Sequence, residues 1–248
     1  DYELGDRTRL VFRYIYNTAQ DDIFNRGATG TFDLSTVGYK FNSRTHNPSI
    51  QFFTHFPSGA SNEVLFSLNR IRDKRDPNVV APLIIVQNFP AADGSLPYSL
   101  QSGAERFSQG NELDQDIWEL TDNFTFPLNS HRLTVGTRNE LYKVRNLFAQ
   151  SSYGVWTFDD LADFQGGVVE QYESAGDLGG GIAATFTAGI FGLYAQDHWQ
   201  INPQVSVTAG LRLDVPTFFD QPTYDPRVAA DGFNTEVPSG QLMLAPRL

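Results

Sequence analysis

GIFGLYAQDHWQINPQVSVTAGLRLDVP, the stretch Gly189–Pro216, decides the fold of this chain. In its second half, Gln204–Asp214, apolar side chains alternate with polar or small ones at every position. Alternate side chains of a β-strand point to opposite faces, so this half predicts a strand with one apolar and one polar face. The first half, Gly189–Gln200, alternates in the same way except at Asp197. The tripeptide Ile201–Pro203 between them is typical of a tight turn, and the whole stretch therefore predicts a β-hairpin.

Two earlier parts of the sequence repeat this strand–turn–strand pattern. The clearer one has strands at Ile117–Phe126 and Arg132–Tyr142 around the turn Pro127–Ser130. The weaker one has strands at Ser49–Phe56 and Glu63–Arg72 around Pro57–Ser61. A seventh strand is expected at Thr8–Thr18, with its partner before residue 1.

The lengths of these strands and of their connections favour a membrane barrel. About seven strands of roughly 8–12 residues are expected, and a strand needs ~9–11 residues to cross a membrane. Strands of ordinary globular proteins average ~5–6 residues. Short turns alternate with three long connections, Ala19–Pro48, Asp73–Asp116 and Lys143–Ala188, which we expect to lack regular structure. Outer-membrane barrels have short periplasmic turns and long extracellular loops.

The predicted fold class is therefore all-β: an antiparallel transmembrane β-barrel segment of about 7–8 long strands that forms an incomplete barrel. One face of each strand would contact lipid and the other would line the lumen. Phe56, Phe126 and Trp199 stand beside predicted turns and are expected to lie at the membrane–water interface.

Composition excludes several other classes of protein. The 248 residues include 18 Lys and Arg against 29 Asp and Glu, a net charge of −11, which argues against a nucleic-acid partner. Cysteine is absent, which removes disulfides and thiolate chemistry. Aromatic residues make up 13% of the chain, and no apolar run approaches the ~18–20 residues of a membrane-spanning helix.

The two ends of the sequence suggest that it is a part of a longer protein. It opens on Asp1-Tyr2-Glu3-Leu4 without the basic and apolar regions of a signal peptide, and it ends inside an expected strand.

The hairpin Gly189–Pro216 resembles the mid-barrel segment of TonB-dependent outer-membrane receptors, in particular the large type that carries a carboxypeptidase-regulatory-like N-terminal domain. In that family an aromatic-Ala-Gln-Asp-x-Trp strand turns through Asn-Pro into a Thr-x-Gly-Leu-Arg-x-Asp strand. The end of the chain, Leu244–Leu248, is similar to the start of an Ala-Pro-Arg-Leu strand in the same family. The residues that match the family motif are Tyr194, Gln196, Asp197, Trp199, Pro203, Gly210, Arg212 and Asp214.

This resemblance implies a 22-stranded barrel in the bacterial outer membrane that is closed by a plug and imports a ligand with energy from the TonB complex. Residues 1–248 would be one partial barrel domain, with the plug and the C-terminal strands outside the chain. The implied partners are outer-membrane lipid, lipopolysaccharide, the TonB complex through the plug, and an unknown ligand. No cofactor is implied.

Residues that carry catalytic or metal chemistry in other proteins form no convincing site here. The four histidines are scattered, and no nucleophile motif such as Gly-x-Ser-x-Gly is present. Asp159, Asp160 and Asp163 are weak candidates for a Ca²⁺ site, although they lack the spacing of a calcium loop. The locally basic run Arg70–Arg75 is a solvated or lipopolysaccharide-facing patch. We expect no enzymatic activity.

Two alternatives remain open at the level of sequence. The first is a soluble all-β binding or structural module, such as a jelly roll or a propeller, with strands of ~5–6 residues in packed sheets. The second is an all-β carbohydrate-active enzyme, whose paired carboxylates would have to come from Glu119, Glu140 or Asp197.

Overall fold

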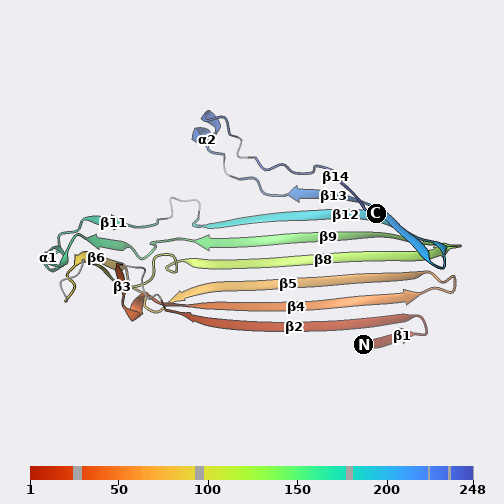
Figure 1. Cartoon of the computed structure of the whole chain (residues 1–248), viewed down its shortest axis with the longest axis horizontal. Helices are drawn as coiled ribbons and strands as arrows, with labels where there is room; N and C mark the ends of the chain where they lie inside the picture. Colours follow the sequence, from red (N-terminus) through yellow and green to blue (C-terminus); the bar gives the residue numbers. More distant parts are fainter. Residues whose placement is uncertain (25–29, 93–97, 177–180, 223, 234–235, 248) are drawn as a thin grey trace.

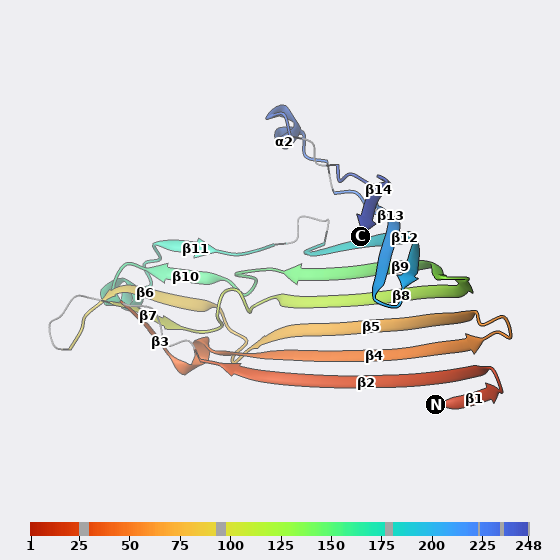
Figure 2. The same cartoon turned by 45° about the vertical axis from the view of Figure 1, so that its right-hand side comes forward.

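The computed structural model describes residues 1–24, 30–92, 98–176, 181–222, 224–233 and 236–247, and its main element is one antiparallel sheet (Figure 1). The sheet has nine strands in the order β1-β2-β4-β5-β8-β9-β12-β13-β14. Figure 2 shows that β13 and β14 bend out of the layer formed by the other strands, so the sheet is curved and open. Its strands are β1 (Tyr2–Gly5), β2 (Thr8–Ile23), β4 (Tyr39–His55), β5 (Ser61–Pro77), β8 (Asn111–Leu128), β9 (His131–Phe148), β12 (Ala183–Asn202), β13 (Val205–Phe218) and β14 (Met243–Arg247).

The all-β antiparallel barrel segment predicted from the sequence is confirmed, and all seven predicted strands are present. Their predicted lengths are wrong, because the seven long strands run for 14 to 20 residues. The expectation that the partner of the first strand lies before residue 1 is also wrong. β2 pairs with β1 on one side and with β4 on the other.

The extra length of the strands follows from a change of chemistry on one face of the sheet, which we call the outer face. Residues paired across neighbouring strands share a face, and the register assigns Val64, Leu120 and Leu193 to the outer face. The lower part of this face, nearest the short turns, is the apolar band. It consists of the outward residues of Leu10–Tyr16, Val64–Leu68, Trp118–Leu128, Leu133–Leu141 and Val207–Val215. Each such segment covers at most 11 residues, which matches the ~9–11 that a strand needs to cross a membrane.

Above the apolar band, the outer face carries charged side chains that we call the charged belt. At this level the charged residues point outward, whereas the inner face carries apolar residues such as Ile71, Leu113 and Val144 beside polar ones. The belt consists of Asp22, Lys40, Arg44, Arg70, Arg72, Lys74, Asp76, Glu112, Asp114, Asp116, Lys143 and Arg145.

Two carboxylates lie on the outer face at the level of the apolar band, Asp122 on β8 and Asp197 on β12, and both are hydrogen-bonded. Asp122 accepts a hydrogen bond of 2.5 Å from the side-chain amide of Asn62. Asp197 lies 2.6 Å from the ring nitrogen Nδ1 of His131. Unpaired polar groups are costly in lipid, and these contacts satisfy one oxygen of each carboxylate.

Local turn chemistry sets the register of the hairpins at the end of the sheet that faces away from the long loops. In the turn between β12 and β13, the side-chain oxygen of Asn202 accepts a hydrogen bond of 2.9 Å from the backbone N–H of Gln204. In the turn between β8 and β9, Asn129 has a φ of 55°, a left-handed conformation that asparagine tolerates. In the turn between β4 and β5, Gly59 has a φ of 81° and adopts the left-handed conformation that glycine allows.

The three long connections contain regular structure, contrary to the expectation from sequence. They contribute β3 (Thr31–Asp33), β6 (Leu83–Phe89), β7 (Tyr98–Ser102), β10 (Val155–Phe158) and β11 (Gln171–Glu173) to a second sheet, in the order β11-β10-β6-β7-β3. A small core of Val37, Leu83 and Val155 holds this sheet together. Short strands of this kind pair with segments far away in the sequence. They contain too few residues for the alternation of apolar and polar side chains to predict them.

Short helical segments complete the structure: η1 (Ser35–Val37), α1 (Leu161–Gly166) and α2 (Pro226–Ala230). Within the described residues, no helix has the length and apolar character required to cross a membrane.

Candidate functional site on the inner face of the sheet

The inner face of the sheet, opposite the apolar band, gathers most of the residues of the family motif. Tyr194 and Gln196 on β12, and Gly210, Arg212 and Asp214 on β13, occupy consecutive positions of this face. They are brought together because the two strands pair without interruption from Ala188 to Gln200.

The other motif residues lie elsewhere. Asp197 and Trp199 point to the outer face, since they alternate with Tyr194 and Gln196 along β12. Pro203 stands in the turn between β12 and β13. The motif therefore joins three structural roles: a polar inner surface, an outer surface and a tight turn.

A network of ionic and hydrogen bonds connects β8 and β9 on the inner face. Glu119 and Glu140 are directly opposite each other in the register. Arg138 joins them, with its Nε 3.1 Å from Glu119 and an Nη 2.8 Å from Glu140. The hydroxyl of Tyr142 donates a further hydrogen bond of 2.7 Å to Glu140. Like charges opposite each other destabilise a sheet, so the guanidinium is what allows both acids to occupy this position.

A second pair of charges lies beside the first, on β13. The Nε of Arg212 donates to both carboxylate oxygens of Asp214, at 2.7 and 2.9 Å. The guanidinium carbon of Arg212 also lies 5.4 Å from the ring centroid of Tyr194, in cation–π geometry. Gly192 makes room for this pair, because a Cβ built on it would come within 2.6 Å of Asp214 and would also clash with Arg212.

The ring of Tyr194 bridges the two groups of residues. It lies over Gly136 on β9, and its hydroxyl donates a hydrogen bond to the side-chain oxygen of Asn123 on β8. One side chain thus crosses from β12 over β9 to β8, which is possible only because the middle position has no side chain.

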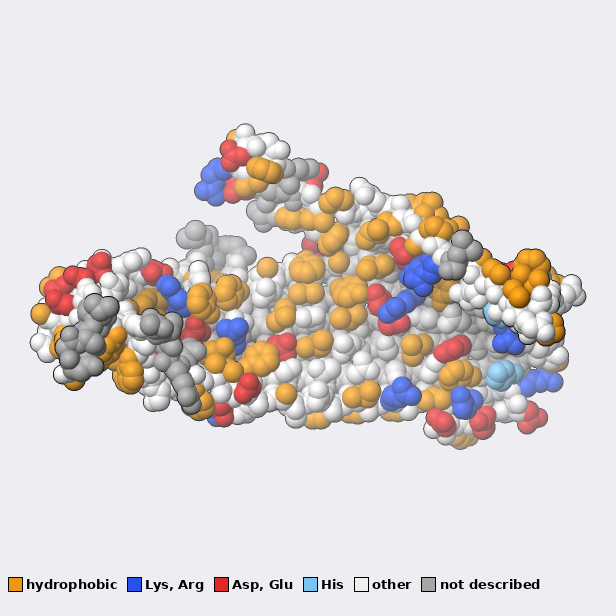
Figure 3. Space-filling view, viewed as in Figure 1, with side chains coloured by type: hydrophobic (Ala, Val, Ile, Leu, Met, Phe, Trp, Pro, Cys, Tyr) orange, Lys and Arg blue, Asp and Glu red, His pale blue; other side chains and the backbone are white. Residues whose placement is uncertain are grey.

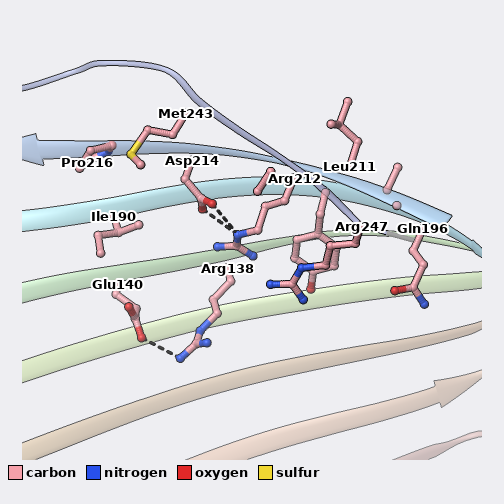
Figure 4. Close-up of a pocket in the computed structure, with 14 residues that line it drawn as sticks. Arg138, Glu140, Ile190, Gln196, Leu211, Arg212, Asp214, Pro216, Met243 and Arg247 are labelled. Carbon is pink, nitrogen blue, oxygen red and sulfur yellow. Dashed lines mark hydrogen bonds and ion pairs between the residues drawn. The ribbon is translucent and has the colours of Figure 1, made fainter. Parts of the chain in front are cut away.

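These side chains line a hollow of about 570 Å³ on the curved side of the sheet (Figure 4). Figure 4 shows the pairs Arg138–Glu140 and Arg212–Asp214 lying next to each other, with Arg247 of β14 beside them. Figure 3 shows basic and acidic side chains close together on this face of the sheet. Such a surface offers guanidinium and carboxylate groups side by side, which suits the recognition of polar or charged molecules.

Arg138, Asn123, Gly136 and Gly192 also belong to this surface, although they were not among the site residues predicted from the sequence. Their positions follow from the register, which the two-residue turn Asn129–Ser130 fixes between β8 and β9. The turn predicted from the sequence, Pro127–Ser130, is longer than the observed one, so the pairing of Glu119 with Glu140 did not follow from it.

The aromatic residues predicted at the membrane interface all lie near the short turns. Phe56 follows β4 and packs edge-on against Phe124, whose ring neighbours that of Phe126. Trp199 stacks on His131 with 5.3 Å between ring centroids. Their interfacial role stays a prediction.

The three aspartates considered for Ca²⁺ lie around α1. Asp160 caps the helix by accepting a hydrogen bond of 2.8 Å from the backbone N–H of Asp163, and Asp159 accepts one of 3.0 Å from Asn88. Among the residues that the structure describes, no three His, Cys, Asp or Glu side chains are arranged to hold a metal ion.

Of the carboxylates considered for glycoside hydrolysis, Glu119 and Glu140 come together, whereas Asp197 lies on the opposite face of the sheet. Both glutamates are bound to Arg138.

Comparison with known proteins identifies the kind of fold. Residues 1–247 match the family model described as an outer membrane beta barrel domain. Among solved structures, the outer membrane transporter YddB from Escherichia coli matches with a TM-score of 0.58 at 11% sequence identity. The match covers 86% of this chain and 26% of that one, so this chain spans about a quarter of the transporter's length. A search of curated protein sequences found no match.

Proposed function

This chain belongs to the outer membrane β-barrel domain family and resides in the bacterial outer membrane, and on this premise we propose that it forms part of the barrel wall of a TonB-dependent receptor. In this proposal the inner face lines the passage through which a ligand is imported. The ligand is unidentified.

The observation that carries the proposal is the contrast between the two faces of the sheet. The inner face presents Arg138, Arg212 and their acidic partners in an open hollow, whereas the outer face at the same level is mostly apolar, with Leu120, Leu193 and Leu211. A wall between lipid and a polar passage requires this contrast. A purely structural wall would not require a hydrogen-bond network that joins two opposed glutamates on this face.

The motif residues support the receptor type. Arg212 contacts both Tyr194 and Asp214 on the inner face. The resemblance of this stretch to TonB-dependent receptors therefore rests on residues that act together in space.

The unpaired edges of the sheet support a barrel that contains further strands. In the described part of the chain, β1 and β14 each pair on one side only. Unpaired backbone groups in lipid cost several kcal/mol each. We therefore propose that further strands close the barrel and that a plug fills it.

The alternatives find less support. Seven strands of 14 to 20 residues in one continuous sheet do not fit a jelly roll or a propeller, whose strands are shorter. No observation favours glycoside hydrolysis, since Arg138 occupies the space between the two opposed glutamates.

The test is direct binding between the full-length protein, purified from outer membranes in detergent, and the purified periplasmic domain of TonB. The proposal predicts saturable binding that is lost when the segment preceding the plug is deleted. Absence of binding at high micromolar concentration, together with a complete gene that encodes no plug, would overturn the TonB-dependent part of the proposal.

A further inference from the structure

Three polar side chains lie on one straight line across the outer face, at the level of the apolar band. They are Asn62 on β5, Asp122 on β8 and Asn139 on β9, and we call them the polar column. Each is one strand further on and two residues nearer the long loops than the one before. All three are half-buried. Contact with lipid does not favour such side chains, because hydrocarbon offers them no hydrogen bonds.

The members of the polar column keep hydrogen-bonding groups that the chain does not use. Asn62 donates a hydrogen bond of 2.5 Å to one oxygen of Asp122, and Asn139 donates one of 2.8 Å to the hydroxyl of Thr137. In the part of the chain that the structure describes, the two amide oxygens and the second oxygen of Asp122 have no donor. A side-chain amide both donates and accepts, so two identical amides can bond to each other.

The order of the strands on the outer face follows from the backbone hydrogen bonds. Ser130 accepts a bond from the N–H of Gln200 on β12, so the outward residues of β9, which alternate with Ser130, direct their backbone groups to β8. For a strand of L-residues that rises toward the long loops, these groups point to the right in a view from outside. β8 therefore lies to the right of β9, and the polar column leans to the left as it rises.

The polar column is consequently close to parallel with the membrane normal. Two residues along a strand span ~7 Å and neighbouring strands are ~5 Å apart, so the column makes an angle of ~35° with the strands. The strands of a barrel tilt by ~35–45°, and the right-handed twist of sheets makes them lean to the right in a view from outside. The two inclinations cancel.

A line of this direction is where a two-fold axis between two copies would lie. Copies that share one membrane in the same orientation can be related only by a two-fold axis along the membrane normal, and residues on that axis meet their own counterparts. Asn62 and Asn139 would then each bond to the same amide of the second copy, as asparagines do between membrane segments. The two Asp122 carboxyl groups would share one proton.

An aromatic knob and a hollow lie on opposite sides of the polar column and fit the same axis. Phe66, which is 46% exposed, is one strand and two residues from Asp122 toward the long loops, on β5. Val135 is the same step away in the opposite direction. It borders a mostly apolar hollow of about 500 Å³ with Leu193 and Leu211.

The knob and the hollow are at similar depth in the membrane. The diagonal from Phe66 through Asp122 to Val135 leans in the same sense as the strands, so it is nearly parallel to the membrane plane. Both ends are roughly 8 Å from the polar column. Rotation about the column therefore places the ring of each copy over the hollow of the other.

We propose that two copies of this protein associate in the membrane through the outer faces of β5, β8, β9 and β12, about a two-fold axis along the polar column. Each Phe66 occupies the hollow of the second copy. The inference goes beyond the proposed function, because it rests on the outer-membrane barrel and is independent of TonB. A protein that fails to bind TonB would still associate in this way.

The first experiment measures self-association of the full-length protein, purified from outer membranes in a mild detergent, by energy transfer between two separately labelled pools. The variants are Phe66→Ala, Asn139→Leu and Asp122→Asn. The matched control is Phe12→Ala, which removes another exposed ring of the outer face from the same row, two strands away on β2. Heat-modifiable migration in gels verifies that each variant is folded.

We expect Phe66→Ala to raise the dissociation constant of the dimer at least about 30-fold, as the loss of a central aromatic anchor does. Asn139→Leu should raise it about three- to tenfold, the effect of one hydrogen bond between membrane segments. Asp122→Asn removes the charge and keeps the polar group, so it should bind at least as well as the wild type. Phe12→Ala should stay within twofold.

The second experiment tests the axis in native membranes with a short bifunctional thiol reagent. Asn139→Cys places identical thiols beside the axis and should yield a cross-linked dimer. Leu10→Cys, three strands away from Asp122 in the same row, should not.

Several results would overturn the proposal. One is a monomer at micromolar concentration in detergent together with no cross-link through Asn139→Cys in membranes. Another is unchanged association of the folded Phe66→Ala variant, which would leave the hollow to lipid. A cross-link from Asn139→Cys to a different protein alone would replace the second copy by another partner.

Discussion

The ring of Tyr194 lies directly over Gly136, the residue opposite it on the neighbouring strand, and a Cβ built on Gly136 would stand 2.7 Å from two carbons of that ring. The same Cβ would lie 2.6 Å from the backbone oxygen of Asp122. Both contacts are shorter than side chains tolerate. The glycine thus allows the tyrosine to reach Asn123 on the second strand away.

Replacing Gly136 with alanine should therefore destabilise the sheet by about 1–3 kcal/mol, the usual cost of inserting a group into a fully packed position. The measurement is urea-induced unfolding of the full-length protein in lipid vesicles. Gly210→Ala is the matched control in a neighbouring strand, because a Cβ there has 3.2 Å to its nearest neighbour and should cost less. Equal stability of the two variants would show that the ring of Tyr194 does not lie over Gly136.

Removal of Arg138 should expose the repulsion between Glu119 and Glu140. Because Arg138 is about half exposed, with a side-chain exposure of 49%, solvent screening limits the expected loss for Arg138→Gln to about 1 kcal/mol. The double variant Arg138→Gln/Glu140→Gln should recover most of that loss, since the opposed charges are gone. Arg132→Gln, on the same face of β9 and without an ionic partner, is the control and should change stability by less than about 0.5 kcal/mol. Failure of the second substitution to restore stability would exclude charge repulsion as the cause.

Much of this arrangement was accessible from the sequence, and the parts that were not have physical reasons. Within the predicted strand Gln204–Asp214, strict alternation placed Val205 to Asp214 on the correct faces, because this pattern is typical of a strand between an apolar and a polar medium. The upper parts of the strands were missed, since residues such as Asp114 and Lys74 are polar where the pattern requires apolar side chains. There the outer face is charged and the apolar residues, such as Ile71 and Leu113, lie on the inner face, which reverses the pattern of the lower part of each strand.

The second sheet was missed for a different reason. Val155 of β10 pairs with Leu83 of β6, more than 70 residues earlier in the chain, in strands of four and seven residues. Neither strand is long enough for the alternation of apolar and polar residues to be recognised. Pairing between segments this far apart in the sequence also produces no local sequence pattern. The network around Arg138, by contrast, follows from the hairpin register.

Substitutions of Asp160 test whether the three aspartates have a structural or a metal-binding role. As the cap of α1, Asp160 should tolerate asparagine, which caps equally well, while Asp160→Ala should cost about 1 kcal/mol of local stability. Hydrogen exchange of the α1 amides, measured with and without millimolar Ca²⁺, reports the difference. If Ca²⁺ slowed exchange in the wild type and Asp160→Asn abolished that effect, the aspartates would be metal ligands.

Labelling single cysteines along β13 shows whether this chain separates lipid from a polar passage. The chain contains no cysteine of its own, so each substitution adds the only thiol within it. In the full-length protein reconstituted into vesicles, Ser206→Cys, Thr208→Cys and Arg212→Cys should react with a water-soluble maleimide. Val207→Cys, Ala209→Cys and Leu213→Cys should be protected by lipid and should carry an environment-sensitive dye in an apolar setting. A period of two in reactivity is the predicted result. Equal reactivity at neighbouring positions would contradict the account.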